Sequence, residues 1–176
     1  MTSIPISTQT HGAATRAPAA PAALGASIIS RLFATPDDKA LVVVRFVLGA
    51  LMFLHGTQKV FGWFGGYGFT GTMGFFTSGM HIPYVFGVLA IAAEFLGGLG
   101  LMLGLLGRVA AFGVAVNMLV ATALVHWPNG LFMNWSGQQK GEGFEYHLLA
   151  VGIALAVMLR GSGALSFDRA IARRIS

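Results

Sequence analysis

Four long apolar runs divide this chain and limit the folds that it can adopt. They cover about 41–60, 82–105, 108–127 and 144–160. A helix needs about 20 apolar residues to cross a bilayer, and about 17 are sufficient. The first three runs meet this length, whereas the fourth is shorter and begins with FEYH. The pattern predicts an all-α membrane protein, an antiparallel four-helix transmembrane bundle in which short connections make neighbours in sequence neighbours in space.

The composition agrees with a membrane protein. Charged residues make up 10% of the chain, against about 25% in an average soluble domain, and the 25 glycines suit closely packed membrane helices. The sequence has no cysteine, which excludes disulfides, thiolate metal sites and iron–sulfur clusters within it. The net charge of +5 comes from basic residues that flank the apolar runs, so it indicates membrane topology rather than nucleic-acid binding.

The positions of Lys and Arg predict the orientation. Basic residues occur in the N-terminal tail, in the short connection at 104–109 and in the C-terminal tail, whereas the opposite side has only Lys59 and Lys140. The positive-inside rule therefore places both termini in the cytoplasm.

The sequence divides into three parts. Residues 1–35 are rich in Ala, Pro, Ser and Thr, which predicts a disordered tail with a short interfacial helix near 24–34. Residues 36–162 form the membrane domain, and the acids of TPDD at 35–38 cap its first helix. Residues 163–176 form a basic amphipathic tail, in which Phe167, Ile171 and Ile175 share one helix face.

Polar side chains inside the apolar runs cost free energy in a bilayer, so each of them is expected to have a structural or functional partner. Arg45, His55 and Lys59 lie on one stripe of the first helix, and Glu94 lies near the middle of the second. We predict that Arg45 and Glu94 form an intramembrane ion pair that locks the two helices together. Two alternatives stay open: Arg45 reaches the inner headgroups, or Glu94 exchanges protons or binds a ligand.

Polar and aromatic residues also converge in the predicted outer half. The predicted ligand-binding residues are His55, Lys59, Trp63, Glu94, His126, Glu145 and Tyr146. An apolar, aromatic-lined cavity with a few polar groups suits a flat, lipid-soluble ligand with carbonyl oxygens, such as a quinone. An aromatic belt and hydrogen-bonded core histidines are the alternatives. No metal site and no cofactor bound permanently within the chain are predicted, and nothing in the histidine spacing demands haem.

Three segments resemble the DoxX family of small bacterial and archaeal membrane proteins. They are VVVRFVLGALMFLHGTQKVFG, AAEFLGGLGLMLGLLGRVAA and GEGFEYHLLAVGIALAV followed by GSGALSFD, within about 40–168. The resemblance implies four membrane helices in the plasma (inner) membrane of a bacterium and a loose association with quinone-linked redox chemistry or oxidative stress. The residues that fall on the family pattern are Arg45, His55, Lys59, Glu94, Arg108, Glu145 and Asp168.

Three functions follow from these expectations. The first is a membrane subunit with a quinone-like ligand in its outer half. The second is a structural or assembly anchor for a soluble or membrane-bound oxidoreductase partner. The third is a small-solute or proton carrier that uses Glu94. The sequence does not decide whether the protein is an enzyme.

Overall fold

The computed structural model describes residues 28–175, and every regular element in this range is helical. Residues 28–33 form a short helix. The other elements are α2 (Lys39–Phe61), η1 (Trp63–Gly65), α3 (Gly68–Gly74), η2 (Phe75–Gly79), α4 (Tyr84–Leu103), α5 (Gly107–Ala121), η3 (Thr122–His126), η4 (Trp127–Asn129), α6 (Glu145–Arg160) and α7 (Phe167–Ile175). The rest of the predicted N-terminal tail, residues 1–27, lies outside the described part of the chain.

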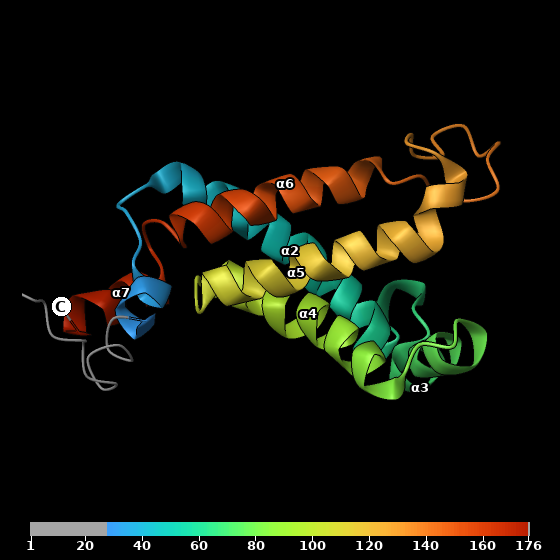
Figure 1. Cartoon of the computed structure of the whole chain (residues 1–176), viewed down its shortest axis with the longest axis horizontal. Coiled ribbons are helices and arrows are strands. Elements are labelled where there is room, and N and C mark those ends of the chain that lie inside the picture. Colours follow the sequence, from blue (N-terminus) through green and yellow to red (C-terminus); the bar gives the residue numbers. More distant parts are fainter. Residues whose placement is uncertain (1–27, 176) are drawn as a thin grey trace, which may run out of the picture.

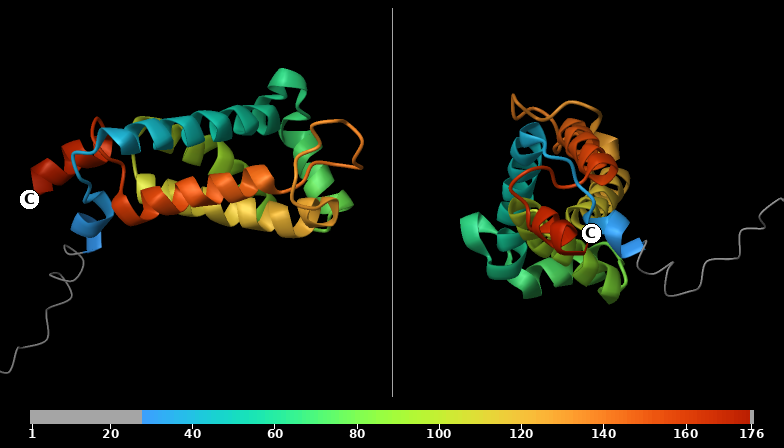
Figure 2. Two further views of the ribbon diagram at one scale, coloured as in Figure 1. Left: turned by 90° about the horizontal axis from the view of Figure 1, so that it is seen from above. Right: turned by 90° about the vertical axis from the view of Figure 1, so that its left-hand side faces the viewer.

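The four long helices lie side by side along the longest axis of the molecule (Figure 1). Helix α2 packs on α4, α4 on α5, α5 on α6, and α6 returns to α2. The helix at 28–33 and α7 lie at one end, which we call the terminal end. Helix α3 and the segment 130–144 lie at the other, which we call the loop end (Figure 2). The arrangement brings the second half of α2 beside the beginning of α6, where the candidate site lies.

Within residues 28–175, three helical segments are long and apolar enough to cross a membrane: Lys39–Phe61, Tyr84–Leu103 and Gly107–Asn129. The third joins α5 to η3 and η4 without a break. Helix α6 has 16 residues, which corresponds to about 24 Å at 1.5 Å per residue, less than the roughly 30 Å of a bilayer core. The protein is therefore an all-helical membrane protein with three clear candidate spans.

Asp38 begins the first long helix, as the TPDD sequence predicts. Its Oδ1 accepts hydrogen bonds from the backbone N–H groups of Ala40, at 2.9 Å, and Leu41, at 3.4 Å. A carboxylate at this position satisfies N–H groups that have no partner within the helix. Gly62 ends the helix in the left-handed conformation, with φ of 77°, which glycine adopts without steric cost.

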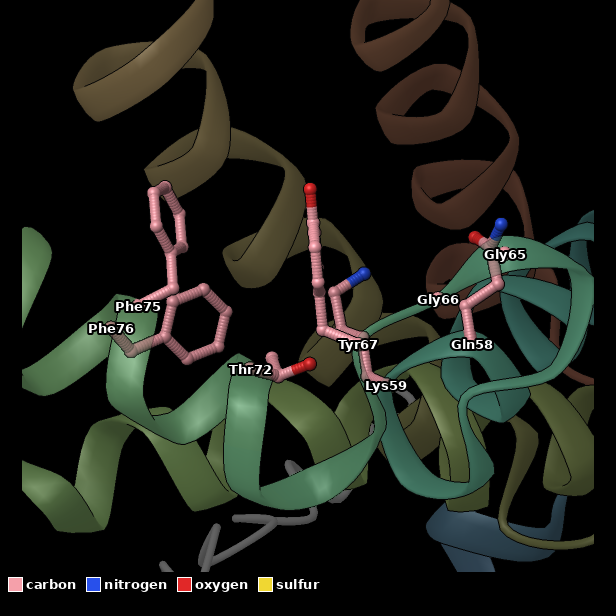
Figure 3. A pocket seen from close by; sticks show the side chains of 8 residues that line it. All are labelled: Gln58, Lys59, Gly65, Gly66, Tyr67, Thr72, Phe75 and Phe76. Atoms are coloured by element: carbon pink, nitrogen blue, oxygen red, sulfur yellow. The ribbon is translucent and has the colours of Figure 1, made fainter.

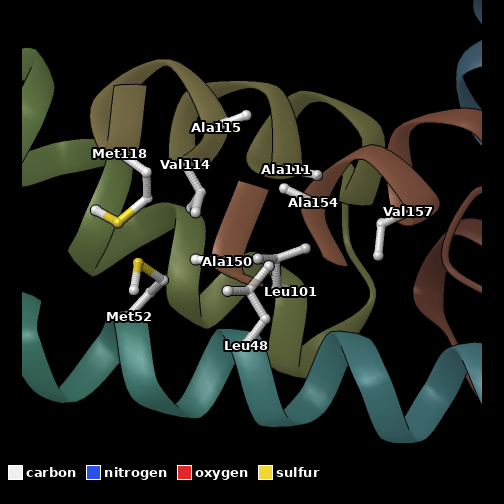
Figure 4. Packing of buried hydrophobic residues seen from close by; sticks show 10 residues of the cluster. All are labelled: Leu48, Met52, Leu101, Ala111, Val114, Ala115, Met118, Ala150, Ala154 and Val157. Atoms are coloured by element: carbon white, nitrogen blue, oxygen red, sulfur yellow. The ribbon is translucent and has the colours of Figure 1, made fainter. Parts of the chain in front are cut away.

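The apolar core lies between the four helices and towards the terminal end (Figure 4). Its members are Leu48, Met52, Leu101, Ala111, Val114, Ala115, Met118, Ala150, Ala154 and Val157. Six of these ten are alanine or valine, so the helix backbones approach closely and small side chains fill the centre. The large apolar residues are concentrated on the outer surface instead, where 40 of them are exposed, as expected when lipid rather than water surrounds the helices.

Three glycines allow a close contact between α2 and α4. A Cβ atom built on Gly49 would lie 2.7 Å from the backbone nitrogen of Met102, and one on Gly98 would lie 2.5 Å from that of Phe53. A Cβ atom built on Gly56 would lie 2.5 Å from the Cα atom of Phe95. Since these neighbours are backbone atoms that cannot move aside, the two helices can pack this closely only with glycine at all three positions.

We expect Gly98→Ala to lower the free energy of unfolding by about 1–3 kcal/mol, the usual cost of overpacking. Gly152→Ala is the matched control, because Gly152 is also helical and exposed, with no atom within 4 Å of a built Cβ. Thermal unfolding in detergent, followed by circular dichroism, measures both variants. Equal melting temperatures for the two would contradict the close α2–α4 contact.

Helix α7 is tied to the segment before α2. The Arg169 guanidinium donates a hydrogen bond to the Asp37 carboxylate, and this bond lowers the pKa of Asp37 and raises the pKa of Arg169. Asp37 is charged in the folded state at a lower pH than in the unfolded chain, so the attachment is complete above the ordinary pKa of an aspartate, about 3.9. The attachment is lost as the pH falls through the lowered value.

We therefore expect proteases to release α7 faster as the pH falls below about 4. Asp37→Asn removes the titrating carboxylate, so its cleavage rate should already be raised at neutral pH and should change less on acidification. An acid-stable protease and gel analysis provide the measurement. Parallel pH curves for the two proteins would show that this pair does not hold α7.

Candidate functional site

The predicted ion pair between Arg45 and Glu94 is wrong, because each side chain has other partners. Side chains on a helix lean towards its N-terminus, so Arg45 leans to the terminal end, away from Glu94. Its guanidinium donates to the carbonyl oxygens of Leu101, Met102, Ser162 and Leu165 at 2.5–2.8 Å. The first two are carbonyls of the last turn of α4, at the negative end of the helix dipole, and that of Leu101 also accepts a hydrogen bond from the backbone N–H of Gly104 at 3.2 Å.

Asp168 completes this arrangement. Its carboxylate accepts hydrogen bonds from the backbone N–H groups of Leu106, at 2.7 Å, and Gly107, at 2.9 Å, where α5 begins. The Ser162 hydroxyl donates to the same carboxylate at 2.5 Å. Asp168 is 1% exposed, and a buried carboxylate at the positive end of a helix is well stabilised. We call Arg45 and residues 161–168 the terminal clasp; it holds the ends of α2, α4, α5 and α6 together.

Glu94 forms the centre of a second buried polar group, nearer the loop end. Lys59, on α2, binds one of its carboxylate oxygens, and the side-chain amide of Asn117, on α5, donates to the other at 2.9 Å. Lys59 leans back from the end of α2 towards the middle of the molecule, for the same geometric reason that Arg45 leans away. The group joins three helices, and we call Lys59, Glu94 and Asn117 the central triad.

A hollow of about 280 Å³ opens beside the central triad. Its lining residues are Gln58, Lys59, Gly65, Gly66, Tyr67, Thr72, Phe75 and Phe76 (Figure 3). The Lys59 side chain is 26% exposed, whereas that of Glu94 is 7% exposed, so Lys59 connects the hollow with the buried carboxylate. The volume lies at the lower limit of ligand pockets and is large enough for one substituted ring.

A second hollow, of about 240 Å³, lies on the other side of Gln58. Leu51, Leu54, His55, Gln58 and Phe64 line it. Gln58 lines both spaces, and its side chain has two hydrogen-bond partners. Its Oε1 lies 3.1 Å from Nδ1 of His55, and its amide donates to the carbonyl of Phe64 at 3.3 Å.

A third polar group lies where α6 begins. The rings of His126 and His147 are 4.1 Å apart between centroids, and Tyr146 lies 5.6 Å from His147 and 6.2 Å from His55. His147 is 7% exposed. Among the described residues, the buried side-chain atoms without a hydrogen-bond partner are Arg108 Nε, Tyr146 Oη and His147 Nδ1. Two of these three atoms thus belong to neighbouring residues of one helical turn.

The predicted site residues are therefore distributed over these spaces. Lys59 lines the first hollow and His55 the second, and Glu94 lies behind Lys59. Trp63 is 56% exposed and contacts Phe61.

The remaining predicted residues lie beyond the hollows, where α5 and α6 meet. The Glu145 carboxylate accepts a 3.4 Å bond from the backbone N–H of Met133, and Nδ1 of His126 lies 2.8 Å from the carbonyl of Glu142. Neither residue lines the first or the second hollow, and Tyr146 lies beside His55 as described above.

Sequence reasoning did not select several residues that line the first hollow. These are Gln58, Tyr67, Thr72, Phe75 and Phe76. The aromatic segment GGYGFTGTMGFF lies between two of the predicted apolar runs, and its folding into α3 and η2 places these rings against the end of α2. Within residues 28–175, no group of three or more His, Asp or Glu side chains is arranged to hold a metal ion.

Comparison with known proteins gives one match. The family model described as DoxX matches residues 40–127, which is half of the chain and contains α2 to η3. The matched region includes the central triad and the first hollow, whereas α6 and most of the terminal clasp lie outside it. No curated protein and no solved structure matches the chain.

Proposed function

The chain belongs to the DoxX family, and we propose that it is a membrane subunit that binds a quinone-like molecule near the central triad. The observation that carries this proposal is the position of Lys59. This side chain lines the first hollow and at the same time binds the buried Glu94 carboxylate. A ligand in the hollow would therefore contact the Lys59 ammonium, which is itself bound to the Glu94 carboxylate.

The lining of the hollow suits a ring with carbonyl substituents. The Lys59 ammonium can donate a hydrogen bond to a carbonyl oxygen, and the Thr72 hydroxyl offers a second donor. The rings of Tyr67, Phe75 and Phe76 provide flat apolar surface for stacking (Figure 3). The second hollow, with Leu51, Leu54 and Phe64, offers apolar space for a hydrocarbon substituent.

We further propose that α6 is the fourth membrane helix and that both termini face the cytoplasm of a bacterium. Helix α6 packs against α5 and α2 and carries apolar side chains over most of its length. Its beginning is linked to the segment 130–144 by a 2.8 Å hydrogen bond from the backbone N–H of Glu145 to the carbonyl of Leu131, so protein satisfies its first backbone N–H group. The orientation rests on the excess of Arg and Lys at the terminal end.

Binding of a short-chain benzoquinone to the purified protein tests the proposed function. Quenching of tryptophan fluorescence reports the affinity. We expect Tyr67→Ala to weaken binding at least about tenfold, or about 1.4 kcal/mol, because it removes one wall of the hollow. Tyr67 is 85% exposed, so its loss leaves the fold intact.

Trp135→Ala is the matched control, because Trp135 is an 86% exposed aromatic residue in the other loop. The Trp135→Ala variant keeps the other tryptophans, including Trp63 near the hollow, so its fluorescence can still report binding. Absence of saturable binding by the unchanged protein, or equal affinities of the Tyr67→Ala and Trp135→Ala variants, would overturn the proposal.

The anchor function has one supporting observation. Phe167 and Ile175 on α7 are 54% and 48% exposed at the terminal end, and Leu165 before α7 is 82% exposed. These side chains and the arginines of α7 could meet either the lipid surface or a partner oxidoreductase. Cross-linking from position 175 in native membranes distinguishes a lipid contact from a protein contact.

A further inference from the structure

We infer that Gln58 determines how strongly the protein discriminates between short and long substituents on its ligand. The inference rests on the proposed binding of a quinone-like ring in the first hollow, and it deepens that proposal by naming a specificity-determining residue. Gln58 is not among the site residues that the sequence predicts. Its importance follows from the position of its side chain and from the groups that hold it there.

Gln58 lies at the boundary of the two hollows. Among the described residues, it alone lines both of them. Phe64 and Gly65 follow one another in the chain, but Phe64 lines the second hollow and Gly65 the first. In the view of Figure 3, Gln58 lies at one side of the first hollow, and Phe75 and Phe76 lie at the other. A substituent that extends from a ring in the first hollow into the second therefore has to pass the Gln58 side chain.

The backbone at this boundary is fixed. A Cβ atom built on Gly66 would lie 2.3 Å from the carbonyl oxygen of Gln58, so the turn that follows α2 packs directly on the helix backbone. Within this turn, Phe64 has φ of 52° and Gly65 has φ of 78°, a left-handed conformation that phenylalanine seldom adopts. Since helix and turn touch through backbone atoms, a way between the hollows opens by rotation of the Gln58 side chain.

Two hydrogen bonds oppose this rotation. Oε1 of Gln58 lies 3.1 Å from Nδ1 of His55, one turn earlier on α2, and the amide nitrogen donates to the carbonyl of Phe64 at 3.3 Å. Rotation out of the boundary breaks both bonds, and their loss weakens the binding of every ligand that requires the rotation. A ligand that occupies the first hollow alone leaves them intact. His55 is therefore a positioning residue for Gln58.

The lining of the second hollow shows which substituents are affected. Leu51, Leu54 and Phe64 make this hollow apolar, and all three side chains are exposed on the outer surface of the protein. A hydrocarbon substituent gains apolar contact there, whereas the Gln58 amide at the boundary is polar. The discrimination is therefore by length. Substituents that end before the boundary leave Gln58 in place, and those that cross it displace the amide from its two partners.

A series of benzoquinones that carry a methyl, a butyl or an octyl substituent tests the inference. Quenching of tryptophan fluorescence measures the affinity of each compound for the unchanged protein and for each variant, in one detergent. For each compound, the dissociation constant of the variant is divided by that of the unchanged protein. Partition of the compound into micelles affects both proteins equally and therefore cancels in this ratio.

We expect Gln58→Ala to raise the affinity for the octyl compound, relative to the methyl compound, by at least about fivefold, the usual size of one hydrogen bond that no longer has to be broken. His55→Phe keeps a ring in the second hollow but cannot bind Gln58, so it should raise the same relative affinity by about threefold. Gln138→Ala is the matched control, because Gln138 is an exposed glutamine of the segment 130–144. It should leave the relative affinity unchanged.

Two results contradict the inference, and they are distinguishable. If the unchanged protein binds the methyl compound, but neither Gln58→Ala nor His55→Phe alters the relative affinity, the inference is wrong and the ligand site in the first hollow stands. If the unchanged protein shows no saturable binding of the methyl compound, the proposed function is wrong and the inference fails with it. Circular dichroism confirms the helix content of both variants. His55 is exposed, so His55→Phe keeps the fold and decides the question even where Gln58→Ala does not fold.

Discussion

Replacement of Arg45 by methionine is expected to lower the free energy of unfolding by at least about 3 kcal/mol. The substitution keeps a long side chain but removes the donors for four carbonyl oxygens, on Leu101, Met102, Ser162 and Leu165. Each buried acceptor that loses its partner costs about 1–3 kcal/mol, and relaxation of the segment 161–166 recovers part of the total.

Two further variants make this measurement specific. Arg45→Lys keeps the charge but cannot reach all four oxygens, because an ammonium lacks the planar fork of a guanidinium, so it should lose an intermediate amount. Arg160→Met removes an arginine whose side chain is 63% exposed and whose Asp38 contact is 3.7 Å long, and it should change little. Melting temperatures in detergent provide the comparison. A loss in Arg45→Met no larger than that in Arg160→Met would contradict the terminal clasp.

Replacement of Lys59 by methionine is expected to cost about 3 kcal/mol, the lower limit for breaking a buried ion pair, because Lys59 is partly exposed. The cost arises from Glu94, whose carboxylate keeps the Asn117 amide but loses its counter-charge. Glu94→Leu should also destabilise the protein, since it removes the acceptor for both neighbours.

The double variant Lys59→Met/Glu94→Leu should recover much of this loss, because an apolar pair of similar size leaves no buried charge. Losses from Arg45→Met and Glu94→Leu should instead add, as expected for residues without a shared partner. Lys140→Met, in the loop, is the control for the loss of a lysine. The central triad would be refuted by additive losses at Lys59 and Glu94.

The sequence predicted correctly that Arg45 and Glu94 are important polar residues within the apolar helices, but it did not predict correctly which groups they contact. Arg45 and Lys59 lie on the same stripe of α2, and both could reach Glu94 by angle alone. The direction in which helical side chains lean decides between them, and the Arg45–Glu94 prediction did not take this direction into account. Asn117 reaches Glu94 from α5 by a 2.9 Å hydrogen bond, and lipid offers such an amide no other partner.

The terminal clasp could not be derived from the sequence. Asp168 fell on the family pattern, but its function as a cap of α5 depends on a turn in which Leu106 has φ of 50°, and Leu165, a partner of Arg45, has φ of 48°. Leucine seldom adopts this conformation, so no local propensity predicts it. The first hollow was missed for a similar reason, since helical folding of the segment 68–79 depends on its packing against α2 and α4.

The terminal clasp can form only late in the synthesis of the chain. Two of the carbonyl groups that bind Arg45 lie 117 and 120 residues further along the chain. When α2 enters the membrane, these acceptors have not yet been made, so the guanidinium cannot bind them until residues 161–165 have been added to the chain. A chain that stops before residue 161 would expose a half-satisfied arginine at the membrane surface, a mark by which quality-control proteases could tell an incomplete chain from a complete one.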